Sequence, residues 1–160
     1  MITVSVTLDD YISAHCIHHA RMRKAMYVAS VIVVAIGTTG AALDAKTWPI
    51  IAICGGIGGI LGQWWEDRLG LPNKVRKLYN QFKGISEPAT ISWDAEYIEG
   101  KGEHGYGKRR WKDNIRLKEN DEVFLLYVTD QLWEAVPKRC FANQAQIDEF
   151  RKYASVAGDT

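Results

Sequence analysis

Near the N-terminus, three histidines and a cysteine lie close together: His15, Cys16, His18 and His19. On a helix, His15 and His19 are one turn apart and face the same way, which is the spacing of a two-histidine metal clamp. A metal site needs further ligands, and the neighbouring Tyr11 and Cys16 do not lie well on that face. We therefore predict that no metal is bound. His15 and His19 are the weak candidates for metal ligands. Two other interpretations remain: polar residues of a helix at the membrane surface, or a contact that changes as histidine titrates.

A second group is basic and consists of Lys108, Arg109, Arg110 and Lys112. Lys138 and Arg139 are candidates to lie beside it across a sheet. Basic side chains held beside the cytoplasmic leaflet would bind acidic lipid headgroups. The alternative is a solvated strand that carries its charge on an outer face.

Motifs for catalysis and for cofactor binding are missing from the sequence. The sequence shows no Ser-His-Asp triad pattern, no recognisable pair of catalytic carboxylates and no phosphate-binding loop. The glycine run Gly55 to Gly62 lacks the full G-x-G-x-x-G pattern, because Leu61 stands in the place of the last glycine. We predict a protein that is not an enzyme and that binds no cofactor.

Composition excludes two further classes. A net charge of +1 leaves no basic excess to neutralise phosphates, so we expect no nucleic-acid partner. The three cysteines have no C-x-x-C spacing, which supports neither a disulfide framework nor a zinc knuckle. A reducing, cytosolic environment fits this cysteine pattern.

The elements that position the histidine and basic groups are organised around two uncharged runs, residues 25–43 and 47–65. At about 1.5 Å of rise per residue, each run as a helix approaches the roughly 30 Å thickness of the hydrocarbon core of a bilayer. Only Asp44, Ala45 and Lys46 separate them, so we predict a transmembrane hairpin, residues 25–65, with a tight turn. The lipid bilayer is therefore an expected partner.

Basic residues flank the two spans on the side away from the turn: Arg21, Arg23, Lys24, Arg68, Lys74, Arg76, Lys77 and Lys83. The turn itself holds Lys46 alone. By the positive-inside rule, both termini are expected in the cytoplasm. Tyr27, Trp48, Trp64 and Trp65 are placed as aromatic residues at the two interfaces.

The second span contains two overlapping G-x-x-x-G registers, Gly55 with Gly59 and Gly58 with Gly62. The first span offers Gly37 and Ala41. Close approach over small residues holds helices together in lipid, where no hydrophobic force acts between them. These residues either pack the hairpin on itself or form a face for a partner helix or for a second copy of the chain.

Three parts remain outside the hairpin. Residues 1–24 read as a strand, alternating from Ile2 to Leu8, followed by a helix at the membrane surface. Residues 66–88 read as a basic linker helix that is interrupted around Gly70 to Pro72. Residues 89–160 read as antiparallel strands closed by one helix that begins at Asn143 and carries Ile147, Phe150, Tyr153 and Val156 on one side.

The element order predicts the fold class: an α+β membrane protein with a small antiparallel barrel like that of pleckstrin-homology (PH) domains. One C-terminal helix closes the barrel, and the N-terminal strand docks on it, because an isolated strand needs an edge to pair with. The large aromatic residues are expected in its core: Trp93, Trp111, Phe124, Tyr127 and Trp133.

Three stretches carry a resemblance to a known family: residues 111–113 (WKD), 124–127 (FLLY) and 136–141 (VPKRCF). Together with the hairpin and the N-terminal strand, their order resembles the YcxB-like family of small bacterial membrane proteins. The resemblance implies a C-terminal domain similar to bacterial PH domains and a place in the bacterial inner membrane. Some proteins of this general build act as immunity proteins against pore-forming or membrane-attacking toxins.

We therefore predict a non-catalytic inner-membrane protein whose PH-like domain and spans bind a protein partner. The partner is either another protein, such as a toxin, or a second copy of the chain bound through the glycine-rich helix. The alternative is a membrane-anchored sensor of lipids or signals that uses the basic face of the PH-like domain.

Overall fold

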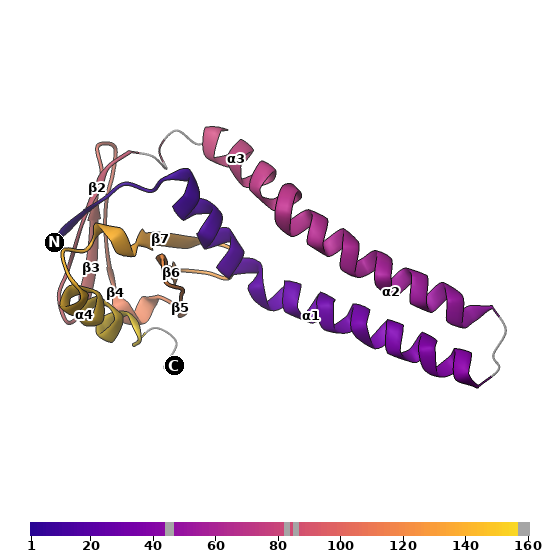
Figure 1. Cartoon of the computed structure of the whole chain (residues 1–160). Coiled ribbons are helices and arrows are strands. Elements are labelled where there is room, and N and C mark those ends of the chain that lie inside the picture. The colour runs from indigo at the N-terminus through magenta and orange to yellow at the C-terminus, as the bar shows by residue number, and fades with distance from the viewer. Residues whose placement is uncertain (44–46, 82–83, 85–86, 157–160) are drawn as a thin grey trace. The chain divides into compact units, whose positions relative to one another are not determined.

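The computed structural model describes residues 1–43, 47–81, 84 and 87–156 (Figure 1). The predicted turn at residues 44–46 and Lys83 therefore lie outside the described residues. The chain forms two compact units. The first, discontinuous unit combines residues 1–18 with residues 75–160, and the second consists of residues 19–74.

The first unit contains a four-stranded antiparallel sheet in the order β1-β2-β3-β4. Its strands are β1 (Ile2–Val4), β2 (Ala89–Trp93), β3 (Tyr97–Lys101) and β4 (Tyr106–Arg110). Ile2 lies opposite Ile91, and Ile2 and Val4 are buried while Thr3 is exposed. The prediction that the N-terminal strand docks on the C-terminal strands is confirmed.

A second sheet has the order β5-β6-β7, formed by β5 (Arg116–Glu119), β6 (Val123–Tyr127) and β7 (Trp133–Pro137). Every residue of β6 is buried. Phe124 and Leu126 join the main core, whereas Leu125 and Tyr127 pack with Ala14 of α1 (Leu8–Ala42). A strand covered on both faces reads as a continuous apolar run. The first turns of α1 are therefore part of this domain.

The C-terminal helix α4 (Gln144–Ala154) begins as predicted, because the Asn143 side chain accepts a hydrogen bond of 2.9 Å from the Gln146 N–H. Phe150 and Ala154 are fully buried in the main core. The inclusion of Val156 in the apolar face was wrong, since Val156 lies beyond the last residue of α4 and is exposed.

The prediction of a closed barrel is also wrong, because the strands of the described chain form two separate sheets. After β4 the chain turns through the short helix η3 (Trp111–Asp113), where the Asn114 N–H donates to the Trp111 carbonyl oxygen (3.1 Å). The next strand then pairs with β6 and not with β4. Trp111, which is only 2% exposed, anchors this corner in the core.

The second unit contains the remainder of α1, α2 (Trp48–Trp65), the π-helical turn η1 (Glu66–Gly70) and the start of α3 (Leu71–Gln81). The predicted interruption around Gly70 to Pro72 appears as this π-helical turn. Pro72 is the second residue of α3 and follows directly after this π-helical turn, so the helix is interrupted where proline has no N–H to donate.

By length and composition, one helix of the described residues, α1, could cross a membrane, and only 11% of its apolar window is buried. α2 carries no charged residue but does not meet the same criterion.

Candidate functional site

The N-terminal histidines lie where α1 meets the second sheet. The His15 ring contacts Tyr11 and Trp133 edge-on, with centroids 4.7 and 5.0 Å away. His18 Nδ1 and the Tyr127 hydroxyl share a hydrogen bond of 2.9 Å, and the two rings stack. His15 and His18 thus pack α1 against the sheet, whereas His19 is exposed.

Among the described residues, one group of three potential metal ligands comes together: Glu87, Glu103 and His104, with ligand atoms within 4.8 Å of one another. The group does not include His15 or His19. It lies at the surface, where acidic side chains commonly gather without a metal.

The basic group of β4 is divided between the two faces of its sheet. Lys108 lies opposite Glu99 and forms an ion pair of 2.5 Å with it. This hydrogen bond raises the pKa of the Lys108 amine above its ordinary value. Arg109 lies opposite the buried Ile98 and so projects from the other face.

Arg109 connects the two sheets. Its two terminal nitrogens bind both carboxylate oxygens of Glu134 in β7, and its Nε donates to Asn114 Oδ1 (2.9 Å). Arg110 pairs with Asp113 at 3.5 Å, and Lys112 is exposed. Nearby acidic residues therefore compensate much of the charge that the sequence places on β4.

Lys138 and Arg139 bind other partners. Lys138 pairs with Glu119 (2.7 Å), while Arg139 pairs with Asp10 (2.6 Å) and donates to the Ser5 carbonyl oxygen (2.6 Å).

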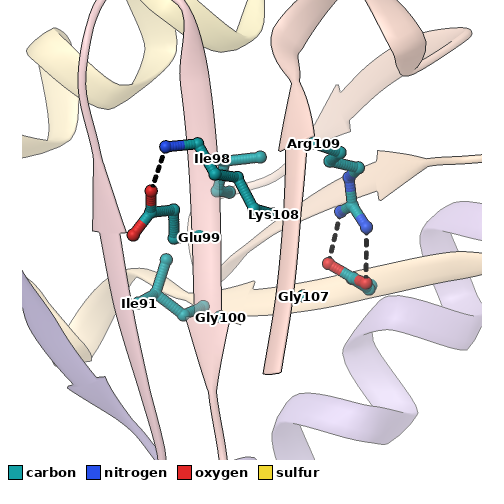
Figure 2. A pocket seen from close by; sticks show the side chains of 8 residues that line it. Ile91, Ile98, Glu99, Gly100, Gly107, Lys108 and Arg109 are labelled. Carbon is teal, nitrogen blue, oxygen red and sulfur yellow. Dashed lines mark hydrogen bonds and ion pairs between the residues drawn. The ribbon is translucent and has the colours of Figure 1, made fainter. Parts of the chain in front are cut away.

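A pocket of about 230 Å³ opens beside β3 and β4 (Figure 2). Gly100 and Gly107 lie directly opposite each other in the ladder, so neither strand supplies a side chain there. The lining residues are Ile91, Ile98, Glu99, Gly100, Gly107, Lys108, Arg109 and Glu134. Figure 2 shows the Lys108 and Arg109 ion pairs on its two sides. Sequence reasoning missed this pocket, although the glycine spacing of the hairpin was its signal.

In the second unit, the glycines divide into two sets. A Cβ atom added at Gly56 would lie 2.5 Å from Val34 Cγ2, and one at Gly37 would lie 2.8 Å from Ile53 Cγ1. One at Gly59 would lie 2.7 Å from Ser30 Oγ. These glycines permit the close approach of α1 and α2. The residues without such a neighbour are Gly55, Gly58 and Gly62, and Ala41 is exposed.

An ion pair that the sequence did not reveal joins the helices of this unit. Arg23 pairs with Asp67 (3.2 Å), and the Tyr27 hydroxyl donates to the same carboxylate (3.2 Å). The π-helical turn carries Asp67. A π-helical turn has a wider period than an α-helix, so the regular α-helical spacing of the sequence does not predict where Asp67 points.

Comparison with known proteins gives one match. No curated protein and no solved structure matches the chain. The matching family model is described as YcxB-like protein and covers residues 93–154, from the end of β2 to the end of α4. This part of the chain matches the YcxB-like family, which confirms the predicted resemblance over residues 93–154.

Proposed function

We propose that the chain is a non-catalytic protein of the bacterial inner membrane that binds a protein partner. Residues 25–43 and 47–65 cross the bilayer as a hairpin, and both termini lie in the cytoplasm. In its more specific form, the proposal is an immunity protein that contacts a pore-forming or membrane-attacking toxin.

The observation that carries the proposal is the discontinuous first unit. Residues 1–18 and 75–160 fold together, so they must lie on the same side of any membrane. The intervening residues 19–74 must then cross the membrane an even number of times. If α1 crosses once, a second segment must return, and α2 is the uncharged helix available for it.

The apolar surface of the second unit supports the same arrangement. Its helices approach each other over glycines, while large apolar side chains are left 50% to 71% exposed: Val28, Val31, Ile32, Ile36, Ile50, Ile51 and Leu61. Such a surface is unfavourable in water and suits lipid, where the helices pack through small residues.

Two features favour a protein partner over lipid headgroups as the ligand. Glu99, Glu134 and Asp113 already compensate the basic side chains of β4. In addition, the open glycines Gly55, Gly58 and Gly62 would allow another helix to approach α2 within the bilayer.

Fusions of a reporter test the topology. Alkaline phosphatase, which is active only outside the cytoplasm, should be inactive after Thr160 and active when it replaces everything beyond Leu43. Green fluorescent protein after Thr160 should fluoresce, and the chain should stay in membranes washed with carbonate. Phosphatase activity after Thr160, or extraction by carbonate, would contradict the proposal.

A further inference from the structure

β4 has a free edge. It is the last strand of its sheet, and in the described parts of the chain no strand pairs with its other side. The ladder with β3 is bracketed by two hydrogen bonds: Gly102 N–H donates to the Gly105 carbonyl (2.8 Å), and Trp111 N–H donates to the Glu96 carbonyl (3.1 Å).

Those two bonds determine which backbone groups face outward. Hydrogen-bonded and non-bonded pairs alternate along an antiparallel ladder. Gly107 and Arg109 therefore direct their backbone groups toward β3. Tyr106, Lys108 and Arg110 direct their N–H and C=O groups toward the free edge, where an added strand would bind them.

The pocket lies next to this edge. Residues opposite one another share a face, so Ile91, Gly100 and Gly107 form one row across the sheet. Ile98 and Arg109 belong to the neighbouring row on the same face. The row through the two glycines ends at the free edge without a side chain, which leaves room for a side chain from outside. A large side chain across a glycine pair is a known way of completing such a row.

We propose that β4 binds an extended segment of a partner protein as an added strand. The segment places a large apolar side chain over Gly107 in the pocket and an acidic side chain, two residues away, toward Arg109. This inference rests on the proposed function, because it names the kind of segment through which a protein partner is bound.

Charge decides between a partner and a second copy. Two β4 edges paired with each other would bring Lys108 and Arg110 against the same basic residues, and like charges across strands are unfavourable. A second β4 would add basic side chains to this edge, whereas an acidic segment would add carboxylates, one of which can replace that of Glu134 at Arg109. Glu134, which now binds Arg109, is 50% exposed and can turn into solvent when another carboxylate takes its place.

The probe is a fluorescent peptide, Thr-Glu-Val-Phe-Val-Glu-Thr, whose sequence is the same in both directions and so covers parallel and antiparallel pairing. Binding is measured to the full chain in detergent. Gly107→Val fills the pocket, and a Cβ atom at this position meets nothing within 4 Å, so the variant should fold. Gly105→Val is the matched control, because Gly105 is also unobstructed but does not line the pocket.

We expect saturable binding to the parent chain and to Gly105→Val, and binding at least about tenfold weaker to Gly107→Val. A peptide with Lys in place of Glu should not bind. With the peptide bound, the amide protons of Lys108 and Arg110 should exchange more slowly, while that of Arg109 should not change.

No binding to the parent chain, equal binding to Gly107→Val, or binding only of anionic phosphatidylglycerol vesicles would overturn the inference. Because the measurement is made in detergent, its failure leaves the result of the topology fusions unaffected. Failure of the inference can therefore be distinguished from failure of the proposed topology.

Discussion

At the scale of single residues, Glu119 joins three elements of the first unit. Its carboxylate accepts hydrogen bonds from Lys138 (2.7 Å) and from Arg151 in α4 (2.8 Å). Both cations also lie over the Phe124 ring, 4.6 and 5.6 Å from its centroid. Partial burial would raise the pKa of Glu119, but the hydrogen bonds from Arg151 and Lys138 outweigh it and hold the pKa below 4.5.

Replacing Glu119 with Gln should therefore destabilise the first unit in a pH-dependent way. A pKa that is lowered by folding contributes stability above the unfolded value of 4.5, and this contribution is lost as the pH falls through the folded pKa. At about pH 7 we expect a loss of about 1 kcal/mol or less in the free energy of unfolding, because the carboxylate is partly exposed. Tryptophan fluorescence during denaturation in detergent measures it.

The difference between parent and Glu119→Gln should shrink as the pH falls below 4.5. Glu122→Gln, an exposed acid between β5 and β6, is the control and should change little at either pH. A difference that stays constant down to strongly acidic pH would show that the ion pairs of Glu119 do not stabilise the fold.

At the scale of elements, the contact of α1 with α2 depends on the absence of side chains. A Cβ atom at Gly56 would lie 2.5 Å from Val34 Cγ2 and 2.9 Å from the Ser30 carbonyl oxygen. Backbone atoms cannot move aside as a flexible side chain can. The helices must therefore separate if a side chain is added here.

Gly56→Ile should destabilise the helix pair by about 1–3 kcal/mol, the usual cost of overpacking. The expected result is a lower melting temperature of the full chain in detergent and faster proteolysis between α1 and α2. Gly55→Ile is the matched control, because a Cβ atom there meets nothing within 4 Å. It should leave melting unchanged, and under the proposed function it should weaken binding of a toxin helix. Equal melting of the two variants would contradict this packing.

At the scale of the whole molecule, residues 1–18 and 75–160, from opposite ends of the chain, form one compact unit. Arg139 is central to this connection, because it binds Asp10 at the start of α1 and the Ser5 carbonyl oxygen. Asp10 in turn accepts hydrogen bonds from the Thr7 N–H and hydroxyl. This is the arrangement of a capping box, which begins α1 beside the C-terminal domain.

Arg139→Ala should release the N-terminal segment, because it leaves the largely buried Asp10 carboxylate without its cation. We expect a loss of about 1–3 kcal/mol and cleavage by protease within residues 1–10, measured by mass spectrometry. Lys112→Ala removes an exposed charge and should change neither property. Unaltered cleavage in Arg139→Ala would show that β1 and Tyr79, which donates to the Val6 carbonyl oxygen, suffice to hold the segment.

Local patterns determined much of the fold by themselves. Alternation located β1, the Asn143 cap located α4, and the length of the uncharged runs located the helices of the second unit. These features depend on neighbours in the sequence. The glycine spacing likewise indicated close helix packing, since small residues serve that purpose wherever they recur on one helical face.

Tertiary structure alone decided which glycines and which charges face one another. Gly56 packs inside while Gly55 does not, because the crossing of two helices selects one of several possible faces. Arg109 meets Glu134, and Arg139 meets Asp10, across separations that no local pattern encodes. The barrel stays open because the chain turns at Trp111 and starts a second sheet, and the resulting free edge of β4 and its pocket are properties of that pairing.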